Sequence, residues 1–389
     1  MKILGIETSC DETALSLIEA SGDQTQPNFK VINTALFSQI ELHKEYGGVY
    51  PSLAKREHAK NLIPLLSELL NENSEKIPDP ETDTETETEI TEEQKKVLTE
   101  VFEREPELLE LFLKVIPKTF KPEVDMIAVT SGPGLEPALW VGINFARALS
   151  YIWQIPVLPV NHMEGHIVSV LRDNKNEIIF PMVALLISGG HTELVLIKNW
   201  GEYEMIGQTL DDAVGEAFDK VARLMDLEYP GGPKVSLLAE KAREQNLDNS
   251  EITLPRPMLH SDNFDFSFSG IKTAVLYKIQ KLKADGDFDE EMKMKVALEF
   301  EDAATEVLYA KTKNALSEYG AQRLIIGGGV IANKHIRETF AKLDTEVSVP
   351  EFELATDNAI MIAMAGYIKS FRNKGEIFPE IKAEGNLKL

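Results

Sequence analysis

Pairs of short apolar runs separated by a polar turn occur twice along the chain, and a third apolar run follows each pair. The runs cover residues 2–7, 13–19 and 31–37 in the first set, and 181–187, 192–198 and 203–209 in the second. Such pairs are typical of β-hairpins. Two further apolar runs, at 124–129 and 323–326, lead through glycine-rich turns into segments with a helical period. This order predicts an α/β protein of two similar lobes, with duplicated hairpin-led sheets facing each other across a central cleft.

The expected domains are an amino-terminal lobe over residues 1–159 and a carboxy-terminal lobe over 160–389, with the last helix able to return to the first lobe. An acidic insertion interrupts the first lobe at about residues 72–116, where 15 Asp and Glu stand against 5 Lys and Arg. Its Thr-Glu alternation cannot bury apolar surface, so the part up to residue 93 is predicted to be exposed. An amphipathic helix pair is predicted next, at 97–102 and 108–115. We interpret the insertion as a solvated elaboration, with a partner-binding role as the alternative.

Two histidines occur at a spacing typical of metal ligands. The segment 161–167 follows an apolar run, 155–160, that predicts a buried strand. If the segment continues as a helix, His162 and His166 lie four residues apart on one face, where two imidazoles can bind one cation. The alternative is that one histidine caps the helix and the other is hydrogen-bonded in the core.

A carboxylate near the end of the chain is the obvious candidate for a third ligand. It is Asp357, in Thr356-Asp357-Asn358, although Thr356 or Asp357 would also serve as a helix cap. Two histidines and one carboxylate would leave open positions for a substrate oxygen, as in non-haem iron or catalytic zinc sites. The sequence alone does not bring Asp357 to His162.

Four turns are suited to an anion or a nucleotide because bare backbone or hydroxyl groups gather in them. They cover residues 8–13, 131–134, 188–192 and 327–329. None matches the P-loop pattern, but their matching positions in two lobes favour a shared nucleotide cleft. Asp219 can hold ribose hydroxyls, as carboxylates do in other nucleotide sites. Asp211 and Asp212 begin the same helix, and one of them is predicted to cap it.

Composition adds limits on partners and compartment. The chain has 389 residues, a formal net charge of −24 and one cysteine, Cys10, so no intramolecular disulfide can form. No apolar run approaches the roughly 18 residues of a membrane span, and the amino terminus lacks a signal-peptide layout. We therefore expect a soluble, cytoplasmic protein. Its charge disfavours nonspecific binding to nucleic acid, so such a partner would need a helper protein or a local basic surface, for which Lys55, Arg56 and Lys60 are the candidates.

Nine stretches together resemble one family, the transferase subunits that make N6-threonylcarbamoyladenosine in tRNA. They are Gly5-Ile6-Glu7-Thr8-Ser9-Cys10-Asp11-Glu12-Thr13, Tyr46-Gly47-Gly48-Val49, Ser131-Gly132-Pro133-Gly134-Leu135, His162-Met163-Glu164-Gly165-His166, Ser188-Gly189-Gly190-His191-Thr192, Asp212 to Lys220, Asp265-Phe266-Ser267-Phe268-Ser269-Gly270, Gly328-Gly329-Val330-Ile331-Ala332-Asn333 and Thr356-Asp357-Asn358. The resemblance covers nearly the whole chain in order. The acidic insertion is its main departure.

The resemblance implies an actin/Hsp70/sugar-kinase-like fold and transfer of a threonylcarbamoyl group from threonylcarbamoyl-adenylate to N6 of the adenosine following the anticodon. It implies one divalent ion per subunit, iron in preference to zinc, held by His162, His166 and Asp357. Asp11 and Glu12 would project toward the same cleft as proton handlers. The implied adenylate contacts are Leu186, Ile187, Ser188, Gly189, Gly190, Asp219, Gly232 and Asn333. The implied partners are tRNA, a smaller paralogous subunit and an ATPase subunit.

Two other functions remain open. A metallopeptidase is suggested because H-x-E-x-H is close to H-E-x-x-H, but Glu164 lies about 200° around a helix from either histidine and would point away from a shared metal. A nucleotide-binding regulator or chaperone-like ATPase with the same lobed fold is the second. No base and acid partners accompany Cys10, so a covalent intermediate is not expected.

Overall fold

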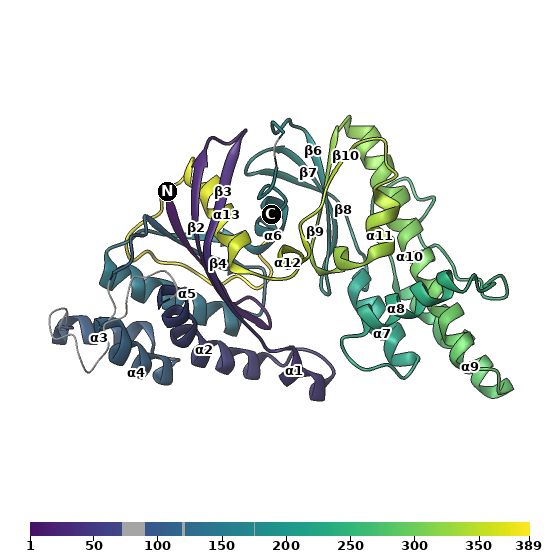
Figure 1. The fold of residues 1–389 in the computed structure, drawn as a ribbon, viewed down its shortest axis with the longest axis horizontal. Helices are drawn as coiled ribbons and strands as arrows, with labels where there is room; N and C mark the ends of the chain where they lie inside the picture. Colours follow the sequence, from purple (N-terminus) through teal and green to yellow (C-terminus); the bar gives the residue numbers. More distant parts are fainter. Residues whose placement is uncertain (72–89, 119–120, 175) are drawn as a thin grey trace. The chain divides into compact units, whose positions relative to one another are not determined.

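The computed structural model describes residues 1–71, 90–118, 121–174 and 176–389 (Figure 1). The chain divides into two compact units. The first holds Met1–His43, Val49–Ile178 and Asp357–Leu389, and the second holds Lys44–Gly48 and Ile179–Thr356. The first unit thus extends to Ile178 rather than ending at residue 159. The prediction of an exposed segment falls largely on residues 72–89, which lie outside the described residues.

The two sheets have the same strand order. In the first unit the order is β3-β2-β1-β4-β5, and in the second it is β8-β7-β6-β9-β10. The strands of the first unit are β1 (Lys2–Glu7), β2 (Glu12–Gly22), β3 (Pro27–Ser38), β4 (Met126–Gly132) and β5 (Val157–Asn161). Those of the second are β6 (Met182–Ile187), β7 (Thr192–Asn199), β8 (Glu202–Gln208), β9 (Arg323–Gly327) and β10 (Glu346–Ser348). Each sheet opens with two antiparallel hairpins and continues with two parallel strands.

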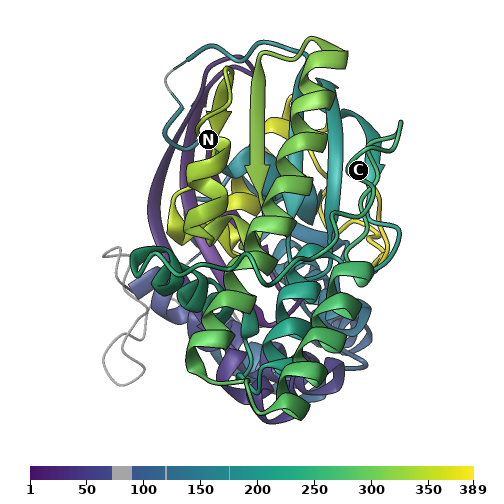
Figure 2. The ribbon, with the colours of Figure 1, turned by 90° about the vertical axis from the view of Figure 1, so that its right-hand side faces the viewer.

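This duplication confirms the predicted fold class, an α/β protein of the actin/Hsp70/sugar-kinase-like type with duplicated hairpin-led sheets. Parallel strands need crossover connections, which the chain supplies as helices. The helices of the first unit are α1 (Ile40–His43), α2 (Pro51–Asn71), α3 (Glu92–Val101), α4 (Pro106–Val115), α5 (Glu136–Trp153), α6 (His162–Ser169) and α13 (Ala359–Ser370). In the second they are α7 (Val214–Leu224), α8 (Gly231–Glu244), α9 (Ser269–Asp285), α10 (Glu290–Tyr319), α11 (Lys334–Phe340) and α12 (Phe352–Ala355), and Figure 2 looks onto these helices.

Helix α13 is the last helix of the chain and packs against β1, β2, β4 and β5 of the first unit. It can do so because it is apolar on every side, as a helix buried all round must be. Gly5 of β1 allows the close approach, since a Cβ there would lie 2.2 Å from Ala359 O. Gly165 of α6 faces the same helix, where a Cβ would lie 3.0 Å from Ile362 Cδ1. Small residues therefore bring β1, α6 and the start of α13 together.

The helix pair predicted inside the acidic insertion is present as α3 and α4. Leu98, Phe102, Leu108 and Phe112 are almost fully buried against α2 and α5 in the core of the first unit. The interpretation of the whole insertion as a solvated elaboration is therefore wrong for this part. Its apolar residues follow a helical period, and their burial outweighs the acidic composition around them.

One ion pair fixes the α3–α4 pair to α2. The carboxylate of Glu105 is buried, with Oε1 2.8 Å from Lys55 Nζ and Oε2 accepting a hydrogen bond from Asn144 Nδ2 at 3.1 Å. Lys55 is thus engaged within the chain rather than held out as a phosphate contact.

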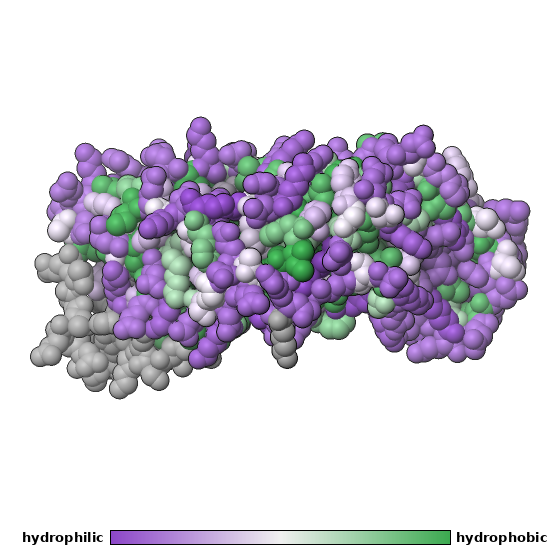
Figure 3. Space-filling view, turned by 90° about the horizontal axis from the view of Figure 1, so that it is seen from above, coloured by the Kyte–Doolittle hydropathy of each residue, from purple (hydrophilic) through white to green (hydrophobic). Residues whose placement is uncertain are grey.

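In the part of the chain that the structure describes, no helix has the length and apolar character to cross a membrane, and hydrophilic residues dominate the face drawn in Figure 3.

Candidate functional site

The two histidines lie on α6, which begins directly after β5. Asn161 caps this helix, and its side-chain oxygen accepts hydrogen bonds from the backbone N–H of Met163 at 2.8 Å and Glu164 at 3.3 Å. The capping position is thus filled by an asparagine, as its short acceptor side chain favours. His162 is therefore free of the capping role that was its alternative explanation.

Asp357 lies beside both histidines. Its Oδ1 is 3.3 Å from His162 Nε2 and 3.2 Å from His166 Nε2. One donor atom from each of the three residues lies within 4.8 Å of the others. All three residues belong to the first unit, although almost two hundred residues separate the helix from the aspartate. The cap of α13 is Asn358, which accepts from Met361 N at 2.9 Å, so Asp357 is not used as a cap.

His162 is oriented from behind by a carboxylate. Its Nδ1 lies 3.2 Å from Glu7 Oε2 and 3.2 Å from Ser9 Oγ. Glu7 is fully buried and is itself fixed by Thr130 Oγ1 and by Ser9 N–H, each at 2.5 Å. With Nδ1 next to Glu7, Nε2 is the ring nitrogen that faces Asp357 and would bind a cation held there, which is the arrangement that carboxylate–histidine pairs give to metal ligands.

His166 supplies the test of whether a metal ion fits. It is 1% exposed, its Nδ1 has no hydrogen-bond partner among the described residues, and its Nε2 has only the contact with Asp357 Oδ1. A buried imidazole with so few hydrogen bonds is costly. Its Nε2 faces the same point as His162 Nε2 and Asp357 Oδ1, so one divalent ion would satisfy all three. The donor set fits iron or zinc.

Charge at the cluster is balanced between carboxylates and imidazoles. Burial alone would raise the pKa of Asp357, but His162 and His166 hold it well below its usual range. Burial would lower the pKa of His162, but Asp357 and Glu7 raise it well above the usual value. Asp357 is therefore an anion at neutral pH, the form in which a carboxylate binds a cation.

Asp11 lies on the turn between β1 and β2, Glu12 is the first residue of β2, and both are largely buried. Burial, with the nearby negative charges of Asp357 and Asp11, raises the pKa of Glu12 to about 10. Glu12 consequently holds a proton at neutral pH. A carboxylic acid kept neutral by burial and like charge is a common feature of sites that transfer protons.

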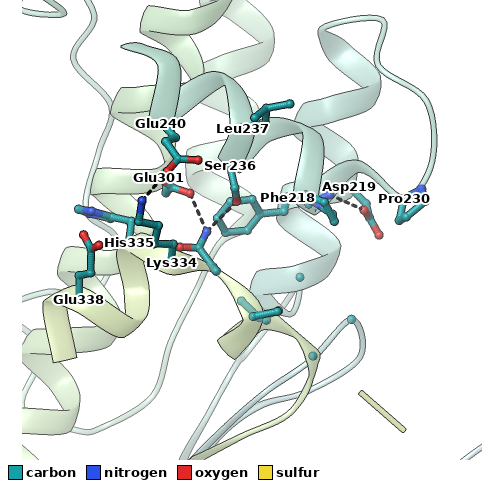
Figure 4. Close-up of a pocket in the computed structure, with 18 of the residues that line it drawn as sticks. Phe218, Asp219, Pro230, Ser236, Leu237, Glu240, Glu301, Lys334, His335 and Glu338 are labelled. Carbon is teal, nitrogen blue, oxygen red and sulfur yellow. Dashed lines mark hydrogen bonds and ion pairs between the residues drawn. The ribbon is translucent and has the colours of Figure 1, made fainter. Parts of the chain in front are cut away.

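A cavity of about 610 Å³ occupies the second unit (Figure 4). Gly189, Asp219, Gly232 and Asn333 line it, together with Ser236 and Glu301. The volume is in the range of small-molecule sites. Leu186 and Ile187 are fully buried within β6 and do not line this cavity, and neither do Ser188 and Gly190.

Two residues that were predicted to contact the adenylate, Asp219 and Gly232, are hydrogen-bonded to each other. Asp219 Oδ1 accepts the N–H groups of Gly231 at 2.8 Å and Gly232 at 3.2 Å. Burial raises the pKa of Asp219. The carboxylate therefore fixes the 229–233 turn with one of its two oxygens.

Asn333 is the cap of α11 and is held on three sides. Its oxygen accepts from Ile336 N at 2.9 Å, and its Nδ2 donates to Ser236 Oγ at 2.7 Å and Glu301 Oε1 at 2.6 Å. Both amide protons are thus used within the chain. Ser236 and Glu301 were not predicted, because a serine and a glutamate inside helices carry no local signal.

The prediction for the helix that contains Asp219 needs a correction. Neither Asp211 nor Asp212 caps α7, whose cap position is Ala213. Asp211 instead accepts from the Ser267 and Ser269 hydroxyls and from backbone N–H groups at the start of α9. Asp212 is paired with Lys220 and Lys272. Both aspartates tie α7 to α9 rather than approach the cavity.

A family model described as TsaD, tRNA N6-adenosine threonylcarbamoyltransferase, matches residues 30–81 and 105–364. The chain belongs to the tRNA N6-adenosine threonylcarbamoyltransferase family. Proteins of that name from Chromobacterium violaceum and Persephonella marina are each 40% identical to it, over 375 and 382 residues. These alignments cover 95% and 96% of this chain, and 93% and 92% of those proteins. Among solved structures, full-length HypF in its phosphate- and nucleotide-bound form is more distant, with a TM-score of 0.48, 14% identity, and coverage of 71% of this chain and 43% of that one.

Membership of the TsaD family identifies the chain as a transferase that acts on tRNA. The matched segments contain His162, His166, Asp357 and the cavity residues of the second unit, whereas Asp11 and Glu12 precede them. Residues 82–104, which include α3, lie between the matched segments. The metallopeptidase alternative is also disfavoured by position, since Glu164 Oε1 lies 3.6 Å from Arg372 Nη2 rather than beside the histidines.

Proposed function

We propose that this member of the TsaD family transfers a threonylcarbamoyl group from threonylcarbamoyl-adenylate to N6 of the adenosine following the anticodon in tRNA, with a divalent metal ion held by His162, His166 and Asp357. The observation that carries the proposal is the convergence of these three donor atoms, with Nε2 of both histidines facing one carboxylate oxygen of Asp357. An iron or zinc ion would supply Lewis acidity for a carbonyl or phosphoryl oxygen.

The chain's own residues would prepare the reaction. Glu7 holds the proton of His162 on Nδ1, so that Nε2 faces the ligand position. Glu12 carries a proton at neutral pH because its pKa is raised, and Asp11 lies beside it. This pair is suited to exchange a proton with the adenine amine as the new N–C bond forms and the AMP group leaves. Cys10 takes no part, since burial raises the pKa of its thiol well above the usual value.

The adenylate would bind in the cavity of the second unit. The other oxygen of Asp219 is suited to ribose hydroxyls, and the bare backbone of Gly189 and Gly232 allows close approach of a ligand. Asn333 would act by shaping the cavity wall, because its amide protons are already donated to Ser236 and Glu301. The 186–190 segment would contribute through Gly189 and through backbone groups.

Partners are part of the proposal. A net charge of −24 gives weak attraction to a polyanion such as tRNA. The family resemblance implies a smaller paralogous subunit and an ATPase subunit as partners, and their help with tRNA would offset this weak attraction.

The test is direct. The protein is incubated with threonine, bicarbonate, ATP, its candidate partner subunits and unmodified tRNA, and the digested nucleosides are analysed by mass spectrometry. Threonylcarbamoyl-adenosine should appear only when this chain is present. A parallel reaction supplied with threonylcarbamoyl-adenylate separates donor synthesis from transfer. Absence of the modified nucleoside in both reactions, with active partners, would refute the proposal.

A further inference from the structure

The segment that carries Asp11 and Glu12 is held through three successive carbonyl oxygens. They are Ser9 O, bonded by Leu135 N at 2.7 Å, Cys10 O, bonded by His58 Nε2 at 3.0 Å, and Asp11 O, bonded by Gln39 N at 2.9 Å. Two of these donors are backbone N–H groups, which every residue except proline supplies. Of the three donors to these carbonyls among the described residues, His58 is the one that uses a side chain, so its bond depends on residue type.

His58 is a fully buried residue of α2. Its Nδ1 lies 2.7 Å from Thr13 Oγ1 and 3.4 Å from Gln39 Nε2. Because the Gln39 amide nitrogen can only donate, Nδ1 must be the acceptor. The ring proton then lies on Nε2 and is donated to Cys10 O. Burial lowers the pKa of His58 to about 4, so the ring is neutral and keeps this single tautomer.

The direction of these bonds is set through a second buried histidine. Tyr50 N donates to His43 Nδ1 at 3.3 Å, and His43 Nε2 in turn lies 3.2 Å from Gln39 Oε1. A backbone N–H at one end and a backbone carbonyl at the other allow only one order of donors along the chain. Gln39 is therefore oriented with its oxygen toward His43 and its nitrogen toward His58. The order fixes the tautomers of both histidines.

We propose that His58 is a positioning residue for the transfer reaction, acting through the Cys10 carbonyl to hold the peptide from which the Asp11 and Glu12 carboxylates extend. The inference rests on the proton-handling role given to these two residues in the proposed function. Among the described residues, no hydrogen bond or ion pair joins His58 to His162, His166 or Asp357. Its effect is on geometry, and a small displacement of a catalytic group is enough to slow a reaction.

Two substitutions of His58 separate its two hydrogen bonds. His58→Gln places an amide near the position of Nε2, where it can still donate to Cys10 O. His58→Asn places an amide near the position of Nδ1, where it can accept from Thr13 but cannot reach Cys10 O. We expect kcat to fall at least tenfold in H58N, with KM for threonylcarbamoyl-adenylate within twofold of wild type, whereas H58Q keeps at least half of kcat.

Hydrogen exchange provides a readout that needs no activity. The amides of residues 9–13 should exchange faster in H58N than in H58Q. If wild type makes no threonylcarbamoyl-adenosine, the proposed function fails while this exchange difference still tests the positioning role. Equal exchange in H58N and H58Q overturns the inference. So does an equal loss of kcat in the two variants, or an effect of H58N that is confined to KM for threonylcarbamoyl-adenylate.

A second pair of variants, at Thr13, keeps the inference testable if H58N fails to fold. Thr13→Val is isosteric but removes the 2.7 Å hydrogen bond to Nδ1, whereas Thr13→Ser keeps the hydroxyl. We expect a several-fold loss of kcat in T13V and none in T13S. Equal kcat in T13V and T13S contradicts the inference.

Discussion

At the scale of single residues, the buried His166, whose Nε2 contacts only Asp357 Oδ1 among the described residues, is the feature that most directly implies a ligand. We expect His166→Ala to lose bound metal and threonylcarbamoyl-adenosine formation together, since one of three donor atoms is removed. His260→Ala is the matched control, because His260 is an exposed histidine of the second unit. Metal content is measured by elemental analysis of the purified proteins. Full metal content in H166A would contradict the assignment of this ligand.

Glu7 is not one of the three candidate metal ligands, but its carboxylate contacts Nδ1 of one of them, His162. Glu7→Gln keeps the shape but removes the charge that favours Nδ1–H on His162. We expect metal affinity to fall roughly 10- to 100-fold, as for other carboxylates that orient a metal-bound histidine. Glu164→Gln is the control, because the Glu164 carboxylate lies on α6 together with the two histidines but faces Arg372. Metal titration of both variants should show the loss in E7Q only.

His58 makes stability depend on pH in a calculable way. Its pKa is about 4 in the folded protein and close to 6.5 in an unfolded chain. The unfolded state thus takes up the proton first, and folding stability falls as pH drops from about 6.5 toward 4. The free energy of unfolding, taken as wild type minus H58Q, should decrease by about 2 kcal/mol between pH 8 and pH 5. Denaturant titrations at the two pH values measure this, and a constant difference would mean that His58 is not buried neutral.

At the scale of elements, helices α3 and α4 are attached to α2 by packing and by one buried carboxylate. Lys55→Met would leave the carboxylate of Glu105, whose side chain is 1% exposed, with the hydrogen bond from Asn144 as its remaining polar contact among the described residues. We expect a loss of about 2 kcal/mol in the free energy of unfolding. Lys60→Met removes an exposed pair with Glu57 and should cost no more than about 0.5 kcal/mol. Similar losses in both variants would show that the buried Lys55–Glu105 pair contributes no more to the free energy of unfolding than the exposed Lys60–Glu57 pair.

The contact between β1 and α13 controls where Asp357 lies. A Cβ on Gly5 would meet Ala359 O at 2.2 Å, so Gly5→Ala must displace the start of α13. We expect lower thermal stability and weaker metal binding in the same variant. Gly270→Ala, where a Cβ would have only an ordinary contact with Pro257, should change neither. Unchanged metal affinity in G5A would separate this contact from the cluster.

At the scale of the whole molecule, the sequence predicted the strands, helices and duplicated order well, because periodicity and turn chemistry are local signals. It failed where a residue's partner is distant. Asp211 looks like a cap for the helix that follows it, yet it binds the start of α9, more than fifty residues away. The acidic composition of the insertion hid the apolar faces of α3 and α4. The sequence did not predict that Glu7 orients His162. It placed Glu7 only at the end of a strand, and its contact with His162 depends on how β1 and α6 lie relative to each other in the folded unit.

The cluster of His162, His166 and Asp357, with the Glu7 carboxylate behind His162, comes from segments that lie far apart in the sequence. Glu7 is synthesised first, His162 follows 155 residues later, and Asp357 follows 191 residues after His166. A nascent chain, or one cut short before α13, would carry two of the three ligands and leave the face of the first sheet uncovered. Acquisition of the ion would therefore distinguish finished molecules from incomplete ones, and prematurely terminated products would remain apo.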